Sequence, residues 1–133
     1  MGMYTGLKGK VILKEKYKSL AERYEFEWNM WLSEAPELKD WNEYSRSSMI
    51  PYGALCYMPN EWDEEPVSYN NGEWFLCCSL KDYENTICYF ITKVLPIIAD
   101  SWDLEELYEE DDNPTKHQHN VESKYERVLR VCK

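Results

Sequence analysis

The chain has few glycines, few basic residues and no long hydrophobic run. Its 133 residues include 5 glycines, and 15 lysines and arginines stand against 25 aspartates and glutamates, for a net charge of -10. The apolar run at residues 94–99 is six residues long and contains a proline, whereas a membrane-spanning helix needs about 20 apolar residues. The N-terminal residues lack the apolar segment of a secretory signal. We therefore expect no membrane segment and no leader.

The motifs of common catalytic and nucleotide-binding sites are missing as well. The sequence has no G-x-G-x-x-G, P-loop, G-x-S-x-G or H-E-x-x-H pattern, and its acidic runs lack the spacing of a calcium loop. Carboxylates are so abundant that no pair of them is diagnostic of acid–base catalysis. We expect neither a cofactor nor an enzyme. The enzymatic alternative is a nucleophile and base formed by Cys77 or Cys78 with His117 or His119.

The cysteines predict a reducing compartment. Their number is odd, each of the 5 lies in or beside an apolar stretch, and no C-x-x-C pattern occurs. We expect free thiols that pack as small hydrophobic residues, and a cytoplasmic location. His117 and His119 would lie on one face of a strand, but a metal site needs a better third ligand than the acidic residues nearby.

Aromatic residues, by contrast, are plentiful. The chain has 6 tryptophans, 11 tyrosines and 3 phenylalanines, and 44% of its residues are hydrophobic. A chain of this length buries roughly two-thirds of its unfolded surface when it folds. The composition therefore predicts a single compact domain over residues 1–133.

Hydrophobic periodicity predicts two amphipathic helices. The first covers residues 14–32, and the second runs from Asp82, its expected N-cap, to about residue 95, where Pro96 should kink or end it. Trp28, Trp31 and Phe90 fall on the two apolar stripes, so we expect them to be buried close together. A further short helix is expected at residues 36–44.

Strands are predicted between these helices. They cover residues 3–13, with Gly9 as a candidate bulge, then 52–58, 74–80, 102–108 and 124–131. A helical turn is the alternative at 102–108, and a short helix at 124–131. Residues 59–72 read as a long acidic loop that ends in a hairpin turn at Asn71 and Gly72. The order predicts an α+β fold, a mainly antiparallel sheet with two amphipathic helices packed on one face.

Charge is distributed unevenly along the chain. Residues 1–23 carry +4, residues 24–120 carry -16 and residues 121–133 carry +2. Seven of the ten residues at 103–112 are acidic, and a second acidic cluster surrounds Trp62 in the long loop. Such density costs stability unless the charge is screened, neutralised or useful. One interpretation is a solvated face partly paired with the N-terminal lysines; the other is a docking surface for a basic protein.

We predict that these acidic segments bind the partner. Carboxylates beside aromatic side chains suit this role, because aromatic residues anchor an interface while charges set its approach and register. The expected partner-binding residues are Glu61, Trp62, Asp63, Glu64, Glu65, Asp103, Glu105, Glu106, Glu109, Glu110, Asp111 and Asp112. Direct binding of nucleic acid is unfavourable, since its phosphates would meet the -16 segment.

In size, acidity and aromatic content the chain resembles the small inhibitor proteins of bacteria and phages, such as anti-CRISPR and toxin-immunity proteins. That resemblance implies a protein that covers a basic, often nucleic-acid-binding, surface of a larger protein. No sequence motif supports this resemblance, so no functional residue of those proteins can be assigned to a position in this chain. The alternative is a housekeeping interaction or scaffold module, including a homodimer paired through a strand edge, and the sequence leaves the oligomeric state open.

Overall fold

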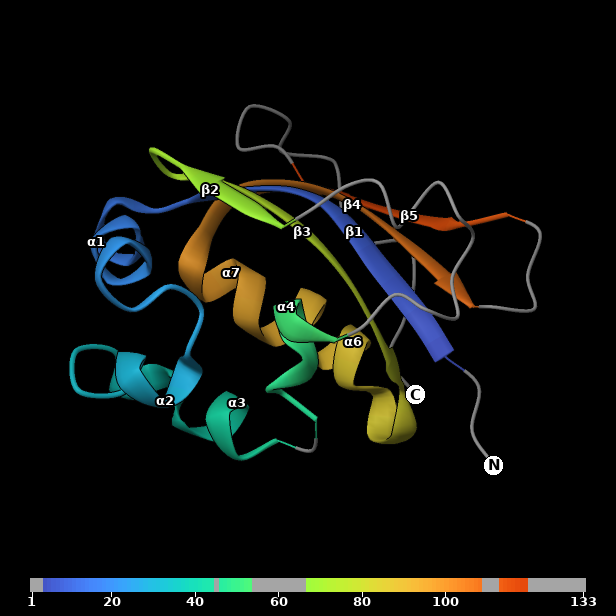
Figure 1. Cartoon of the computed structure of the whole chain (residues 1–133), viewed down its shortest axis with the longest axis horizontal. Coiled ribbons are helices and arrows are strands. Elements are labelled where there is room, and N and C mark those ends of the chain that lie inside the picture. Colours follow the sequence, from blue (N-terminus) through green and yellow to red (C-terminus); the bar gives the residue numbers. More distant parts are fainter. Residues whose placement is uncertain (1–3, 45, 54–66, 109–112, 120–133) are drawn as a thin grey trace.

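A five-stranded antiparallel sheet carries the fold, with helices gathered on one of its faces (Figure 1). The computed structural model describes residues 4–44, 46–53, 67–108 and 113–119. The strand order is β2-β3-β1-β4-β5. The strands are β1 (Tyr4–Leu13), β2 (Ser68–Asn70), β3 (Glu73–Lys81), β4 (Ala99–Tyr108) and β5 (Thr115–His119). The α+β class predicted from the sequence is confirmed.

The helical side is built from short pieces. They are α1 (Glu15–Tyr24), α2 (Trp28–Trp31), the 3-10 turn η1 (Pro36–Leu38), α3 (Lys39–Glu43), α4 (Met49–Tyr52), the 3-10 turn η2 (Tyr83–Asn85), α6 (Thr86–Tyr89), the π-helix η3 (Phe90–Val94) and α7 (Leu95–Ile98). Among the helices described, none has the length and hydrophobicity to cross a membrane.

β1 lies in the centre of the sheet, between β3 and β4. Gly9 pairs in continuous register with Leu76 on one side and Leu104 on the other, and the irregularity in β1 falls between Ile12 and Leu13. The strand is therefore confirmed, and the candidate bulge at Gly9 is wrong. Residues 102–108 belong to β4, so the predicted strand is confirmed there and the alternative of a helical turn is wrong.

The core lies between the sheet and the helices. The buried strand residues that belong to it include Leu7, Val11 and Leu13 of β1, Trp74, Leu76, Cys78 and Leu80 of β3, and Trp102 and Leu104 of β4. The Trp28 ring lies 4.9 Å from that of Trp31 and 6.3 Å from that of Phe90, measured between ring centroids. All three side chains are at most 4% exposed. The expected clustering of these residues is confirmed.

The first predicted helix is broken in two. The chain leaves the helix after Tyr24, and Glu25 adopts a positive φ of 53°. Phe26 then turns into the core and stacks on Trp74, with 3.8 Å between ring centroids. The single helix over residues 14–32 is wrong because burial of Phe26, which lies off the apolar stripe, outweighs continuation of the helix.

The second predicted helix is present in a modified form. It runs through α6, η3 and α7 to Ile98, and the side chain of Asp82 accepts a hydrogen bond from the Ile87 N–H at 3.0 Å. Pro96 lies within α7, past the predicted end, and the π-helix directly precedes that last segment. A proline lacks the N–H that an α-helical turn requires, so a change of helical register before it is expected.

The remaining predictions have mixed outcomes. η1 and α3 confirm the short helix at residues 36–44, and the hairpin turn is confirmed, with φ of 50° at Asn71 and 89° at Gly72. Tyr52 lies in α4, not in a strand. The long loop predicted at 59–72 is wrong at residues 68–70, which form β2 and pair with β3 because the turn at Asn71 and Gly72 folds them back onto that strand. The predicted elements at 54–58 and 124–131, and residues 59–66 of the loop, lie outside the described residues.

Candidate partner-binding surface

The acidic residues predicted to bind a partner fall on different parts of the fold. Asp103, Glu105 and Glu106 belong to β4. Residues 61–65 and 109–112 lie outside the described part of the chain. The structure therefore locates three of the predicted residues, and it divides them between the two faces of the sheet.

Asp103 and Glu105 lie on the face away from the helices, where they meet lysines. In the strand register Lys8 lies opposite Glu105 and Lys10 lies opposite Asp103. On the other side, Lys116 of β5 approaches Glu105 with 3.8 Å between Nζ and Oε1. Glu105 is thus paired with Lys116, and Asp103 accepts a hydrogen bond from the Gln118 amide at 2.9 Å. Lys10 forms its ion pair with Glu73 of β3, at 3.0 Å, so the lysines of β1 lie beside these carboxylates and lower the net negative charge of this face.

Reversing the charge of Glu105 should consequently destabilise the protein. Glu105→Lys would place a cation between Lys8 and Lys116, and like charges on neighbouring strands repel. We expect the free energy of unfolding to fall by about 1–2 kcal/mol, measured by urea denaturation. Asp100→Lys is the control: Asp100 is exposed at the start of the same strand and belongs to none of the ion pairs among the described residues. Equal stability of the two variants would contradict this account.

Glu106 lies on the helical face and is buried. Its exposed fraction is 6%, that of His117 is 1%, and the Nε2 of His117 lies 2.9 Å from the Glu106 carboxylate. Placing Glu106 on the partner-binding surface was therefore a mistake, because successive strand residues point to opposite faces. The alternation of charged and apolar residues in 102–108 was a signal that could have separated Glu105 from Glu106.

The described residues do not bring together a cysteine and a histidine as nucleophile and base. Cys77 faces away from the helices, while Cys78 lies three strands from His117, a separation of about 14 Å at the usual strand spacing. Burial also raises the pKa of the Cys78 thiol far above its ordinary value, which keeps it protonated and unreactive. Within the described ranges no group of three or more potential metal ligands forms.

One cysteine departs from the predicted pattern. Cys77 and Cys78 are free, as expected, whereas Cys88 is disulfide-bonded. The prediction of five free thiols is therefore wrong at Cys88.

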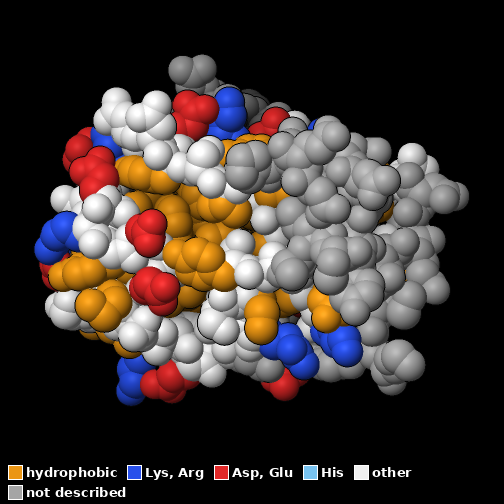
Figure 2. All heavy atoms as spheres, in the orientation of Figure 1, with side chains coloured by type: hydrophobic (Ala, Val, Ile, Leu, Met, Phe, Trp, Pro, Cys, Tyr) orange, Lys and Arg blue, Asp and Glu red, His pale blue; other side chains and the backbone are white. Residues whose placement is uncertain are grey.

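A different surface combines exposed apolar side chains with carboxylates. We define the Tyr52 surface as Tyr52, Met30, Met49, Glu25 and Glu27. The three apolar side chains are 51%, 48% and 39% exposed, in that order. Burial of part of the ring raises the pKa of the Tyr52 hydroxyl, and the neighbouring Glu27 and Glu25 carboxylates raise it further. Figure 2 shows hydrophobic side chains gathered on this helical side, with carboxylates among them.

A hollow of about 350 Å³ adjoins this surface. It lies where α2, the C-terminal end of α3 and the turn before α4 meet. The residues that line it are Phe26, Glu27, Trp28, Asn29, Asn42, Tyr44, Arg46, Ser47, Ser48 and Tyr52. The lining therefore combines aromatic rings with amides, hydroxyls and one charge of each sign.

Hydrogen bonds fix the segments that form this surface. The Phe26 N–H donates to the Tyr52 hydroxyl at 3.2 Å, and the Trp28 Nε1 donates to the Ile50 carbonyl at 2.7 Å, which join the region around α2 to α4. The Trp31 Nε1 donates to the carbonyl of Glu25 at 2.8 Å, so the Glu25 backbone is held while its carboxylate stays exposed.

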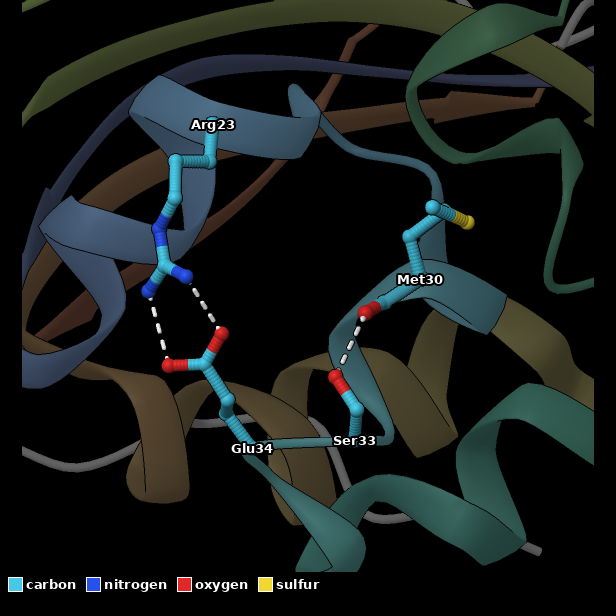
Figure 3. Close-up of polar contacts among 4 residues, drawn as sticks. All are labelled: Arg23, Met30, Ser33 and Glu34. Carbon is cyan, nitrogen blue, oxygen red and sulfur yellow. Dashed lines mark hydrogen bonds and ion pairs between the residues drawn. The ribbon is translucent and has the colours of Figure 1, made fainter.

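An ion pair holds α1 to the chain that follows α2. Figure 3 shows the Arg23 guanidinium donating two hydrogen bonds to the Glu34 carboxylate, at 2.6 and 2.7 Å. In the same view, the Ser33 hydroxyl lies 3.5 Å from the Met30 carbonyl that accepts its hydrogen bond. These contacts fix the backbone that carries the exposed Met30 side chain.

Sequence reasoning missed this surface. The signal that was available is the alternation of acidic and aromatic residues from Tyr24 to Trp28, which a continuous amphipathic helix does not explain. Comparison with known proteins adds no assignment to this geometry: no family model, curated protein or solved structure matches the chain.

Proposed function

We propose that this protein is a binding module that docks on a basic partner protein through the Tyr52 surface. The observation that carries the proposal is the placement of Glu25 and Glu27 on either side of Phe26, whose N–H bonds the hydroxyl of the exposed Tyr52. The exposed Met30 follows Glu27 by one helical turn, and the exposed Met49 lies in the same short helix as Tyr52. Neither glutamate takes part in an ion pair with another described residue. Two carboxylates that form no ion pair with another described residue thus lie on the surface that exposes these apolar side chains.

The two kinds of side chain have complementary roles in such an interface. Tyrosine and methionine are enriched at protein interfaces and supply the buried contact area. Carboxylates at the edge steer a basic partner and set its orientation, more than they add affinity. The outer face of β4 suits this role less well, because Lys8, Lys10 and Lys116 lie beside its carboxylates.

We further propose that binding inhibits the partner by covering it. The chain carries a net charge of -10, so its preferred target is a strongly basic surface, including one that normally binds nucleic acid. The acidic residues at 61–65 and 109–112 would add to this field. A cytoplasmic location stays a prediction: the free Cys77 and Cys78 support it, and the disulfide at Cys88 counts against it.

Reversing two carboxylates should abolish binding and leave the fold intact. In Glu25→Lys/Glu27→Lys we expect at least about a tenfold loss of affinity at low salt, because attraction becomes repulsion. The melting temperature should hardly change, since exposed carboxylates contribute little to stability. The partner is obtained by placing a photo-crosslinking residue at the exposed Met30, and its affinity is then measured over a salt series.

The matched control is Glu22→Lys/Asp100→Lys, which makes the same change in net charge at exposed positions outside the Tyr52 surface that belong to none of the ion pairs among the described residues. This control should retain most of the affinity. Equal losses in both double variants would mean that net charge alone governs binding. An affinity that is insensitive to salt would favour the alternative of an apolar scaffold or homodimer contact.

A further inference from the structure

The hollow beside Tyr52 has an apolar interior and a polar edge. Phe26 and Trp28 are each 4% exposed and form part of its floor, while Tyr44 and Tyr52 add aromatic rings to the lining. The amides of Asn29 and Asn42 and the hydroxyl of Ser48 supply polar groups. This is the usual composition of a recognition pocket, in which apolar contacts bind and a few polar groups orient the ligand.

The size of the hollow limits what can enter it. Its volume of about 350 Å³ lies at the lower end of the range for ligand pockets, roughly 300–1,000 Å³. A whole helix is too large to enter. One large apolar side chain of a bound protein segment fits this volume and would contact the aromatic rings.

The charges near the hollow add a second requirement. Glu27 and Arg46 are the acidic and the basic residue of the described lining, so the charges within the hollow balance. Glu25 adds a second carboxylate close to Tyr52, which makes the outer edge anionic. A partner segment would match both the apolar interior of the hollow and its anionic edge if it placed an apolar side chain in the hollow and a lysine or arginine at the edge.

We infer that the hollow receives a single large apolar side chain, aromatic or long aliphatic, from a partner segment in which a lysine or arginine follows or precedes it closely. This inference rests on the proposed function and names the element of the partner that the surface recognises. The basic side chain meets Glu25 and Glu27, while the apolar side chain packs against Tyr52 and Trp28.

Hydrogen bonds among the described residues of the lining favour such recognition. The Ser47 hydroxyl donates to the Asn42 carbonyl at 3.2 Å, and the Ser47 N–H donates to the Tyr44 carbonyl at 3.2 Å. The Met49 N–H donates to the Arg46 carbonyl at 2.9 Å. These bonds join the residues at the end of α3 to those at the start of α4, so fewer groups of the lining have to be ordered when a partner segment binds.

Selection from a random peptide library tests the inference without assuming a partner. The immobilised full chain is panned at low salt against displayed short peptides. We expect the selected peptides to share a large apolar residue with a neighbouring lysine or arginine. A synthetic peptide of that consensus is then titrated into wild type and variants, with fluorescence anisotropy as the readout.

Blocking the hollow should remove this binding. Ser48 is exposed at the edge, and Ser48→Trp fills the space without changing charge, so we expect at least about a tenfold weaker affinity, the effect of losing one well-packed anchor. Asn29→Trp is a second blocking variant in case the first misfolds. The control is Ser19→Trp, an exposed serine of α1 that does not line the hollow, and it should bind like wild type.

The outcomes separate this inference from the proposed function. Absence of a consensus, an acidic consensus, or a consensus peptide that binds Ser48→Trp and Asn29→Trp as well as wild type would overturn the inference. In those cases the proposed function still stands if the protein captured at Met30 loses affinity in Glu25→Lys/Glu27→Lys. If the consensus peptide binds wild type and loses affinity in Ser48→Trp and Asn29→Trp, but no protein is captured at Met30, the inference stands and the proposal that the protein docks on a cellular partner is overturned.

Discussion

Phe90→Ala should lower the free energy of unfolding by about 3–5 kcal/mol, because truncating a buried phenylalanine removes its transfer free energy and leaves a cavity. The Phe90 ring is fully buried in the π-helix. Its centroid lies 5.4 Å from that of Trp41, 6.1 Å from that of Trp74 and 6.3 Å from that of Trp28. The side chain thus joins α2, α3 and β3 in one aromatic cluster, and three neighbouring rings cannot all move to fill the space.

Urea denaturation followed by tryptophan fluorescence measures this effect. Lys93→Ala is the matched control, because Lys93 lies on the exposed side of the same π-helix. It should change stability by no more than about 0.5 kcal/mol, as is usual for surface positions. Phe90→Leu should give an intermediate loss. If Phe90→Ala were as stable as Lys93→Ala, the packing of the second helical segment onto the aromatic cluster would be wrong.

Periodicity located the buried side chains better than it located the ends of helices. The stripe that contains Trp28 and Trp31 was correct, yet the helix that was expected to carry it breaks at Glu25. Phe26 is off the stripe, and its stacking on Trp74 needs β3 to be in place. That contact joins residues far apart in sequence, so no local pattern could reveal it.

Charge counted along the chain could not reveal which carboxylates are free. The N-terminal lysines lie opposite Asp103 and Glu105 only because β1 enters the centre of the sheet and pairs with β4. The acidic residues of the Tyr52 surface are fewer and more scattered, so a search for dense acidic runs passes over them. Their exposure beside Tyr52 depends on α2 and α4 meeting, which the Trp28 hydrogen bond to Ile50 establishes.

The central position of β1 also makes Gly9 a sensitive backbone site in the sheet. Gly9 has a φ of 145°, a region that residues with a Cβ rarely adopt. A Cβ built there would lie 2.1 Å from the Asp103 carbonyl oxygen and 2.7 Å from the Leu104 Cα. Both atoms belong to the backbone of β4, so relief requires the two strands to separate.

Gly9→Ala should therefore lower the free energy of unfolding by about 3–6 kcal/mol, the combined cost of a strained backbone and of overpacking. Gly72→Ala is the informative comparison in the same denaturation experiment. Gly72 also has a positive φ, of 89°, but its added Cβ would meet the flexible Lys18 side chain, at 2.9 Å. We expect that variant to lose only about 1–2 kcal/mol, since the lysine can move and the backbone strain remains. Equal losses in the two variants would show that the positive φ alone sets the cost at Gly9. A larger loss in Gly9→Ala would mean that glycine is required there because the backbone of β4 approaches so closely. The same close approach brings Asp103 and Glu105 to the lysines of β1.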